Sequence, residues 1–449
     1  MQTPDHEDRR GPRTRTPIRS RARRRRPVQA AALLVGAALT VAACSSTTPP
    51  GTSTAGTATA SPGTSVAGNG SGALLPLDRA AMDAVVKDMA TGFHVPGMVV
   101  MIKRPQGDYV NTYGVTERNG TTPVTLDTRV RVGSNTKTWT GTAVLQMVQE
   151  GKISLKDPVS KYVPNVPNGD NITIAQLGDM RSGLANYTQT LPLNVALDTE
   201  PEKVWTPAEL LALAYPNPPY FPPGQGWEYS NTNTVLLGQI AEQLDRKPLG
   251  QILQDRFFTP LGMTGTSFPA ATDTSIPSPS SRGYMYGTNV ETMGDPSIPA
   301  DQLAQVQAGT LAPKDVTTDN PSWTWSAGQG ISTANDIATW VKAMVSGKLL
   351  DAATQKTRMD GVLPNGKGGS YGFTLAKMGP LYGHTGELPG YNSFMGYDPV
   401  NDVTIVAWGN LAPAADGRPP AVTLVRALIP LVYASGPQET DAAGAKLPD

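Results

Sequence analysis

Ser134 and Lys137 place a hydroxyl and an amine three residues apart, in a Ser-x-x-Lys motif. The residues before Ser134 form a short extended run ending at Gly133, and those after it repeat apolar side chains at helical spacing. We therefore expect Ser134 at a helix N-terminus, where free backbone N–H groups favour negative charge. Residues three apart share a helix face, so the amine can reach the hydroxyl. These are the parts of an activated serine nucleophile.

The motif alone does not establish chemistry. In a chain of 449 residues, Ser-x-x-Lys is expected about twice by chance at average composition. A serine that only caps the helix would account for Ser134 equally well. Whether Ser134 is a nucleophile therefore depends on which other residues could assist its hydroxyl.

Few histidines are available as a base for Ser134. The chain has three, His6, His94 and His384. Ser134 does not lie in a Gly-x-Ser-x-Gly motif, so the α/β-hydrolase form of a Ser-His-acid triad lacks its signature at this serine. If Ser134 is a nucleophile, its base is Lys137 or a phenol. With three histidines and one cysteine, we expect no metal site and no cofactor.

A second motif supplies a phenol and an amide. A Gly-rich turn at residues 223–226 leads to Tyr229 and Asn231, directly before an expected helix. Residues two apart in an extended chain point to the same side, so both side chains can face one cleft. The structural alternative is that Ser230 and Asn231 cap the helix while Tyr229 belongs to the core.

A third motif, His384-Thr385-Gly386, lies on an expected strand near the end of the chain. Gly386 would let a substrate backbone approach that strand closely. The hydroxyl of Thr385 can donate a hydrogen bond to a carboxylate, and His384 offers a neutral or positively charged ring. The alternative is that a lone histidine on a strand serves only the structure.

The elements that must position these motifs come from both ends of the chain. Strands with hairpin turns are expected at residues 97–104, 109–116, 381–387, 391–397 and 403–408. Besides the helix after Ser134, helices are expected at residues 173–179, 206–214, 232–244, 334–345 and 421–432, and residues 267–321 are mostly aperiodic. This order predicts an α/β protein of the α+β type, with an antiparallel sheet flanked by helices and an inserted all-helical lobe. A ligand cleft is expected between the two lobes.

The first residues are typical of an export signal. Residues 1–27 contain ten Arg, residues 28–43 are apolar, and the only cysteine, Cys44, follows directly. The pattern resembles a bacterial lipoprotein signal of residues 1–43, in which the cysteine becomes the lipidated N-terminus; an ordinary secretory signal is the alternative. Residues 44–73 are rich in Ser, Thr, Gly and Pro and predict a flexible tether.

We expect one folded hydrolase domain at residues 74–435 and a disordered tail at residues 436–449. Removal of residues 1–43 takes away ten basic and three acidic residues, so the 37 of each sign become 27 and 34, a net charge of −7. An acidic protein is a poor partner for nucleic acid and offers no basic patch to lipid headgroups. Attachment to a membrane is therefore expected through the lipid alone.

In this order, Ser-x-x-Lys, Tyr-x-Asn and His-Thr-Gly resemble the penicillin-recognising serine enzymes. This version is most similar to the secreted serine D-alanyl-D-alanine carboxypeptidases of actinobacteria, and similar to class C β-lactamases, which carry Lys-Thr-Gly at the third place. The resemblance covers nearly all of residues 77–435, including Arg181-Ser-Gly-Leu184. It implies a serine beta-lactamase/transpeptidase-like fold.

The resemblance also implies roles for the motif residues. Ser134 would be the acylated nucleophile, and Lys137 would accept its proton directly or through Tyr229, which then protonates the leaving amine. To act as a base near neutral pH, Lys137 needs a depressed pKa, which burial could provide.

The other motif residues would bind the substrate. Asn231 would hold the substrate amide, and His384 and Thr385, with Gly386, would recognise a terminal carboxylate. The backbone N–H groups of Ser134 and Glu387 would form the oxyanion hole, a contribution of roughly 3–4 kcal/mol per donor.

Two residues depart from the pattern of these relatives. Lys377 stands where the carboxypeptidases carry an Arg-rich strand, and the acidic Glu387 follows His-Thr-Gly directly. Both lower the positive potential expected for a substrate that ends in a carboxylate, which leaves room for esters or amides.

Three functions therefore stay open. The first is an exported serine hydrolase, lipid-anchored to the outer face of the cell membrane, that acts on peptidoglycan stem peptides. The second is an esterase or class C-like β-lactamase, with small esters or β-lactams as substrates. The third is a catalytically idle envelope lipoprotein.

Overall fold

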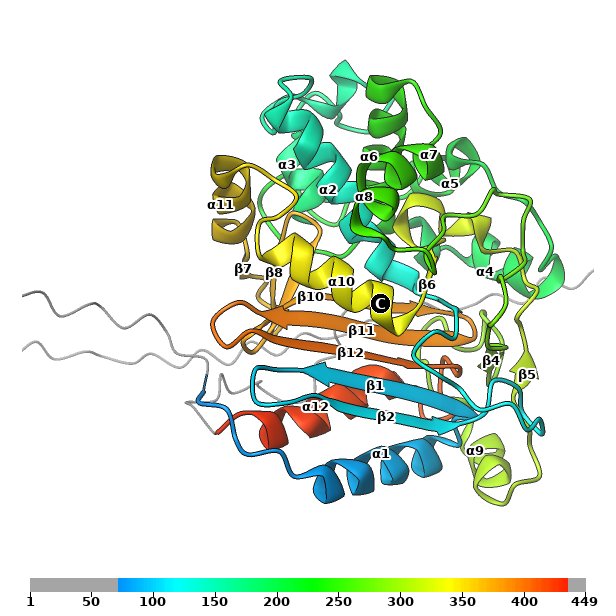
Figure 1. Cartoon of the computed structure of the whole chain (residues 1–449). Helices are drawn as coiled ribbons and strands as arrows, with labels where there is room; N and C mark the ends of the chain where they lie inside the picture. The colour runs from blue at the N-terminus through cyan, green and yellow to red at the C-terminus, as the bar shows by residue number, and fades with distance from the viewer. Residues whose placement is uncertain (1–71, 435–449) are drawn as a thin grey trace, which may run out of the picture. The chain divides into compact units, whose positions relative to one another are not determined.

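The computed structural model describes residues 72–434. Its centre is an eight-stranded antiparallel sheet of order β2-β1-β12-β11-β10-β9-β8-β7 (Figure 1). The strands are β1 Gly97–Lys103, β2 Tyr109–Gly114, β7 Leu363–Pro364, β8 Ser370–Gly372, β9 Leu375–Met378, β10 Leu381–Leu388, β11 Tyr391–Asp398 and β12 Val403–Gly409. Because β1 pairs with β12, the first and last strands of the domain are neighbours, as the sequence predicted.

Helices cover both faces of this sheet. Helices α1 (Arg79–Phe93) and α12 (Pro420–Val432) pack on one face, and α10 (Ala334–Val345) packs on the other (Figure 1). Successive residues of β1 accordingly contribute to two separate cores, Val99 to the core beside α10 and Val100 to the core beside α12. Burial on both faces explains why β1 and β12 are nearly continuous apolar runs.

The helical lobe extends from the α10 side of the sheet. It contains α2 Thr136–Gln149, α3 Ile174–Gly178, α4 Leu191–Thr199, α5 Pro207–Ala214, α6 Asn231–Asp245, α7 Leu249–Leu253, a π-helical turn Gln254–Phe258 and α8 Thr259–Leu261. Helices α2 and α6 pack against each other at its centre. The antiparallel sheet and the inserted helical lobe confirm the predicted fold class.

Local signals account for several helix starts. Thr173 and Thr206 each close a capping box at the beginning of α3 and α5, and Pro207 occupies the first helical position of α5. Helices α3, α5 and α6 each begin within one residue of the predicted start.

Helix α2 differs from the expectation of one buried face, because nearly all of its side chains are buried. Its threonines are buried together with its apolar residues. The hydroxyl of Thr140 donates to the carbonyl of Ser326 at 2.8 Å, and that of Thr142 to the carbonyl of Thr138 at 2.6 Å. A hydroxyl that finds a backbone acceptor can be buried at little cost.

Several elements were not predicted from the sequence. They are helices α1, α4, α7, α8, α9 (Ala300–Gln307) and α11 (Ala352–Asp360), strands β7, β8 and β9, strand β6 (Ile331–Ser332), and the pair β4 (Tyr284–Met285) with β5 (Lys314–Asp315). Strand β3 (Val130–Arg131), which pairs with β6, overlaps the extended run predicted before Ser134. Helix α9 and the β4–β5 pair lie within residues 267–321, which the sequence left mostly aperiodic. Short 3-10 turns occur at Gly133–Asn135, Val159–Lys161, Tyr187–Gln189, Pro321–Trp323 and Trp325–Ala327.

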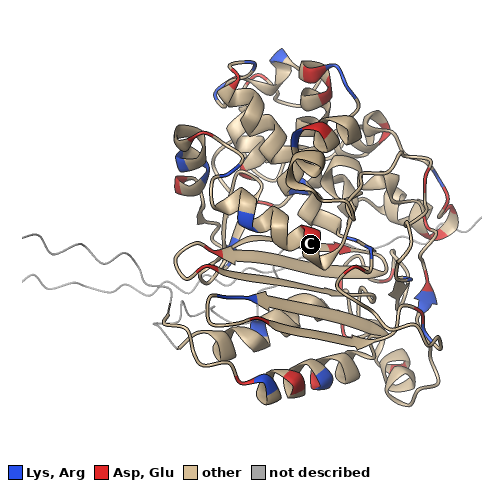
Figure 2. Ribbon diagram, in the orientation of Figure 1, with Lys and Arg blue, Asp and Glu red and all other residues tan. Residues whose placement is uncertain are grey.

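The expected signal, Cys44, most of the tether and the C-terminal tail lie outside the described residues. Within residues 72–434, no helix has the length and apolar character needed to cross a membrane. On the face drawn in Figure 2, Lys and Arg are interspersed with Asp and Glu along the helices and loops.

Candidate active site

Ser134 lies in the 3-10 turn directly before α2. From 131 to 145 it is the one residue that is partly exposed, while its neighbours in the chain are buried. The preceding Gly133 has a φ of +53°, and a Cβ there would lie 2.6 Å from the backbone nitrogen of Glu387. Glycine is therefore required both by the turn and by the close approach of β10.

The structure places Ser134 one residue before the N-cap of α2, which is Asn135. No side-chain hydrogen bond caps this helix. The hydroxyl of Ser134 is therefore not used as a helix cap, which removes the structural alternative considered for this residue.

Lys137 is fully buried and is the one buried lysine among residues 72–434. Its Nζ lies 2.8 Å from Oγ of Ser134, 2.6 Å from Oδ1 of Asn231 and 2.9 Å from the carbonyl oxygen of Ala327. None of these partners is a carboxylate. Burial therefore lowers the pKa of Lys137 well below its ordinary value.

The three partners of Lys137 match the hydrogen-bonding capacity of a neutral amine. The amide oxygen of Asn231 and the carbonyl of Ala327 can only accept, so they take the two N–H donors of a neutral amine. The remaining lone pair then points at Ser134, whose hydroxyl can donate. This arrangement makes Lys137 able to remove the proton of Ser134.

Tyr229 lies over the same amine. The Nζ of Lys137 is 4.8 Å from the centre of the Tyr229 ring, which is buried among Met180, Trp227 and Tyr371. Tyr229 and Asn231, expected to face one cleft, both reach Lys137. Tyr229 is part of a small core cluster and also part of the site, so the two interpretations of this residue do not exclude each other.

Asn231 is held by two residues that the sequence did not single out. Its Nδ2 donates to Oγ1 of Thr188 at 3.1 Å and to Oδ1 of Asn186 at 3.3 Å. Oδ1 of Asn186 also accepts from the backbone N–H of Asn231 at 3.1 Å. These contacts fix the amide with its oxygen toward Lys137.

Strand β10 forms the other wall, and its half-buried residues include Thr385 and Glu387, which point to one side because they are two apart. A Cβ at Gly386 would lie 1.9 Å from the carbonyl oxygen of Val132. The glycine is therefore needed where β10 crosses the chain just before Ser134, whereas the sequence suggested close approach of a substrate.

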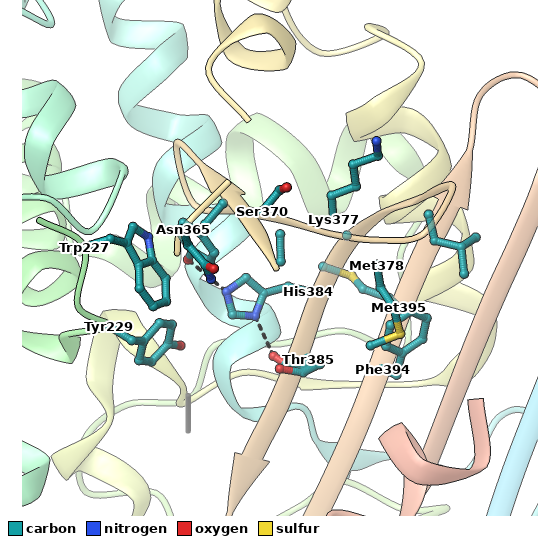
Figure 3. A pocket seen from close by; sticks show the side chains of 14 residues that line it. Trp227, Tyr229, Asn365, Ser370, Lys377, Met378, His384, Thr385, Phe394 and Met395 are labelled. Atoms are coloured by element: carbon teal, nitrogen blue, oxygen red, sulfur yellow. Dashed lines mark hydrogen bonds between the residues drawn. The ribbon is translucent and has the colours of Figure 1, made fainter. Parts of the chain in front are cut away.

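The ring of His384 is buried behind Thr385. Its Nδ1 lies 2.6 Å from the carbonyl oxygen of Thr385, and its Nε2 lies 2.9 Å from the hydroxyl of Tyr371 (Figure 3). Burial, followed by the positive charge of Lys137, lowers the pKa of His384 to about 3. The ring is therefore neutral at ordinary pH, and both of its nitrogens already have partners.

Lys377 lines the outer part of the same region, but its side chain points away from Thr385 and Tyr229 (Figure 3). Its Nζ lies 5.3 Å from the centre of the Tyr382 ring. In the residues that the structure describes, no group of three His, Cys, Asp or Glu side chains could hold a metal ion.

A partly exposed serine paired with a buried amine, at the seam of an antiparallel sheet and a helical lobe, defines the class of active-serine hydrolases. Residues 82–428 match the Beta-lactamase family model, so the chain belongs to the beta-lactamase family. This family includes penicillin-binding proteins and amidases that are serine hydrolases.

Two solved structures illustrate the likeness. The D-stereospecific amidohydrolase from Streptomyces sp. is 28% identical with a TM-score of 0.66, over 78% of this chain and 98% of that one. The D-amino acid amidase from Ochrobactrum anthropi SV3, complexed with L-phenylalanine, is 25% identical with a TM-score of 0.66, over 78% and 96%.

A curated relative is the putative penicillin-binding protein PbpX of Bacillus subtilis (strain 168), 27% identical over 62% of this chain and 61% of that protein. The first matching relatives are Protein flp of several Staphylococcus aureus strains. The chain spans between 38% and 62% of the length of these curated relatives.

Proposed function

We propose that this protein is a serine hydrolase that forms an acyl-enzyme on Ser134 and cleaves amides or esters of D-amino acids. The observation that carries the proposal is the 2.8 Å contact between Ser134 and the buried amine of Lys137. The likeness to a D-stereospecific amidohydrolase and to a D-amino acid amidase supports the choice of substrate.

In this mechanism Oγ of Ser134 attacks the substrate carbonyl while its proton passes to Nζ of Lys137. The backbone N–H groups of Ser134 and Glu387 would stabilise the oxyanion. Collapse of the tetrahedral intermediate breaks the bond to the leaving group, which takes the proton from Lys137, directly or through Tyr229. Water then attacks the ester and regenerates Ser134 by the same route.

Carboxypeptidase action on peptides ending in D-Ala-D-Ala is the second candidate. The hydroxyl of Thr385, half-buried on β10, can donate to a terminal carboxylate. We also propose that the protein is exported, anchored through Cys44 to the outer face of the membrane, and meets peptidoglycan stem peptides there. Esterase or β-lactamase action by the same acyl-enzyme is the remaining catalytic alternative.

Mass spectrometry after incubation with benzylpenicillin tests the nucleophile. We expect an adduct on the peptide containing Ser134, absent in Ser134→Ala and retained in Ser275→Ala, which removes an exposed hydroxyl. Hydrolysis of D-alaninamide, L-alaninamide and a peptide ending in D-Ala-D-Ala then ranks the substrates. No adduct and no turnover would favour a catalytically idle envelope protein.

A further inference from the structure

We propose that a cavity in the helical lobe is a second ligand site, separate from Ser134, and that it binds an uncharged molecule with an apolar ring. The cavity lies between the C-terminal end of α5 and the chain on either side of α3. Its volume is about 400 Å³, within the range of small-molecule sites in proteins. The hollow beside Tyr229 and Thr385 measures about 40 Å³. The larger cavity is therefore the one with room for a ring.

The lining of the cavity is apolar on its inner side and open to solvent on its outer side. Ile172, Leu184 and Ala214 are buried lining residues, whereas Pro219 and Pro222 line the cavity and are exposed. A molecule that enters covers apolar surface that otherwise faces water. This gain in burial favours a hydrocarbon ring as the occupant.

A proline-rich segment keeps the cavity open. Residues 216–223 include five prolines, which fix their own φ and favour extended backbone in the residue before each of them. The N–H of Tyr220 donates to the carbonyl of Gly183, and that of Gly224 donates to the carbonyl of Arg181, both at 2.8 Å. A stiff segment that is anchored in this way does not collapse into the space beside it. The site is therefore preformed, and binding requires little ordering of the chain.

The chemistry of the wall favours a neutral ligand with a hydroxyl group. No residue that lines this cavity carries a charged side chain, so a charged ligand would lose water without gaining a charged partner. Asn217 lines the cavity, and its Nδ2 donates to the carbonyl oxygens of Leu213 at 2.8 Å and Ala214 at 3.2 Å. These bonds leave Oδ1 of Asn217 to accept from a hydroxyl of the ligand.

The cavity shares a wall with the active site. Ala185 lines the cavity, and its carbonyl accepts from the hydroxyl of Thr232 at 2.6 Å and from that of Ser230 at 3.3 Å. These two residues flank Asn231, whose amide oxygen contacts Lys137. A molecule packed against Ala185 is therefore separated from the residues around Asn231 by a single backbone segment.

Tyr220 makes a second connection to the active site. Its side chain lines the cavity, and its hydroxyl accepts from the backbone N–H of Asn186 at 3.2 Å. Oδ1 of Asn186 in turn accepts from Nδ2 of Asn231 at 3.3 Å. Tyr220 is 41% exposed, so an occupant adds contacts to it and restricts its motion. Occupancy should therefore hold Asn231 in place and speed the acylation of Ser134, a consequence that rests on the proposed function.

Calorimetric titration of the full-length protein with 2-naphthol tests the binding. 2-Naphthol is a neutral molecule with two fused rings and one hydroxyl, and 2-naphthoate has the same rings with a carboxylate. We expect 2-naphthol to bind at one site. We expect 2-naphthoate to bind at least roughly tenfold more weakly, because the wall offers its charge no partner.

Ala214→Phe fills the cavity from the end of α5 and should weaken the binding of 2-naphthol by more than roughly tenfold. Ala212→Phe, at an exposed position of the same helix outside the cavity, is the matched control and should leave binding unchanged. Asn217→Trp blocks the cavity from an exposed position, and it provides the same test should Ala214→Phe fail to fold. Thermal unfolding verifies that each variant is folded.

The rate at which a reactive ester acylates Ser134 tests the connection to the active site. Saturating 2-naphthol should raise this rate by roughly fivefold in the wild type, and should have no effect in Ala214→Phe. Tyr220→Phe keeps the ring but removes the hydroxyl that accepts from Asn186. It should bind 2-naphthol and lose most of the increase.

The proposal is overturned if the wild type does not bind 2-naphthol, if 2-naphthoate binds better, or if binding persists in Ala214→Phe and Asn217→Trp. An acylation rate that bound 2-naphthol leaves unchanged would overturn the connection to Asn231. Absence of acylation of Ser134 by every reagent would instead overturn the proposed function. Calorimetry would still decide whether the cavity is a ligand site.

Discussion

The hydroxyl of Tyr371 lies 2.9 Å from Nε2 of His384, on the side of the ring opposite Thr385. A carbonyl can only accept, so Nδ1 of His384 carries the proton that bonds the carbonyl of Thr385, and Nε2 accepts from Tyr371. These two hydrogen bonds, from the Tyr371 hydroxyl and to the Thr385 carbonyl, fix both the tautomer and the orientation of His384. They therefore support the strand that carries Thr385.

Asp179 is a second buried titratable group near Tyr371, and burial raises its pKa, whereas burial lowers the pKa of His384. Asp179 follows α3, and burial raises its pKa to about 7. Burial also raises the pKa of Tyr371, with smaller contributions from Tyr229 and Asp179. The folded protein thus holds a proton on Asp179 between pH 3.8 and 7, which the unfolded chain releases. This contribution to stability is present at low pH and is lost as pH rises through 7.

His384 has the opposite effect. Its pKa falls from 6.5 to about 3, so between these values the unfolded chain binds a proton that the folded protein does not. Its contribution is present above pH 6.5 and is lost as pH falls. Each group changes the free energy of unfolding by about 1.4 kcal/mol per pH unit, so the two nearly cancel between pH 4 and 6.5.

Asp179→Asn should expose this cancellation. Asn keeps the shape of the protonated acid but cannot titrate. Relative to the wild type, the free energy of unfolding of the variant should fall by about 1.4 kcal/mol for each pH unit below 6.5. Urea unfolding at pH 4, 5, 6 and 7 measures it, with exposed Asp170→Asn as control. Parallel curves for wild type and Asp179→Asn would contradict the assignment.

Replacement of Lys137 tests its role as the base. Lys137→Met keeps most of the volume of the side chain and removes the amine, so acylation of Ser134 should slow by roughly 10²- to 10⁴-fold. Lys137→Arg should be no better, because a guanidinium keeps its proton. Stopped-flow acylation by a reactive ester measures the rates. Wild-type activity in Lys137→Arg would rule out proton transfer to this residue.

The pH dependence of the wild type gives an independent measurement. Because burial lowers the pKa of Lys137, the amine is neutral above that pKa and protonated below it. The acylation rate should therefore rise with pH through the pKa of Lys137 and then level off. His384 is neutral above about pH 3. His384→Gln should therefore leave unchanged the pH at which the acylation rate rises, even where it lowers the rate itself.

Local sequence patterns predicted the parts of the site that lie close in the chain. The helical spacing of Ser134 and Lys137 and the two-residue spacing of Tyr229 and Asn231 both depend on backbone periodicity alone. Their meeting around Nζ of Lys137 is set by the packing of α2 on α6.

Other contacts of the site could not be predicted because they join distant segments. Asn186 bonds Asn231 from 45 residues away, and nothing in its neighbourhood marks it as an amide clamp. Tyr371 bonds His384 across β8 and β10, which requires the register of the sheet. The need for Gly386 arises from Val132, more than 250 residues earlier.

The lipid anchor remains a prediction from the sequence. Cys44 follows an Arg-rich and then apolar segment and is the only cysteine. Cys44→Ala should move most of the protein from the membrane fraction to the soluble fraction, because attachment is expected through the lipid and the acidic exported chain offers no basic patch to lipid headgroups. Cell fractionation with Ser45→Ala as control measures this. Unchanged membrane association in Cys44→Ala would contradict the anchor.

Glu387 offers the sharpest test of substrate charge. Its side chain shares a face of β10 with Thr385, and one of its carboxylate oxygens accepts from Nδ2 of Asn392 at 3.1 Å. An anion next to Thr385 opposes a substrate that ends in a carboxylate. Lys377 does not offset it, because its side chain points away (Figure 3). We therefore expect peptides that end in free D-Ala to be poorer substrates than neutral esters or amides.

Glu387→Thr removes the charge and leaves the backbone N–H in place. It should raise kcat/KM for a peptide ending in D-Ala-D-Ala by roughly tenfold relative to a neutral D-alanine ester, the scale of one nearby charge in a partly solvated site. Glu387→Gln, which keeps the shape, should produce most of the same change. Because altered oxyanion stabilisation would affect both substrates alike, the ratio isolates the effect of charge. Equal changes for both substrates, or a wild type that strongly prefers the free carboxylate, would refute the hypothesis.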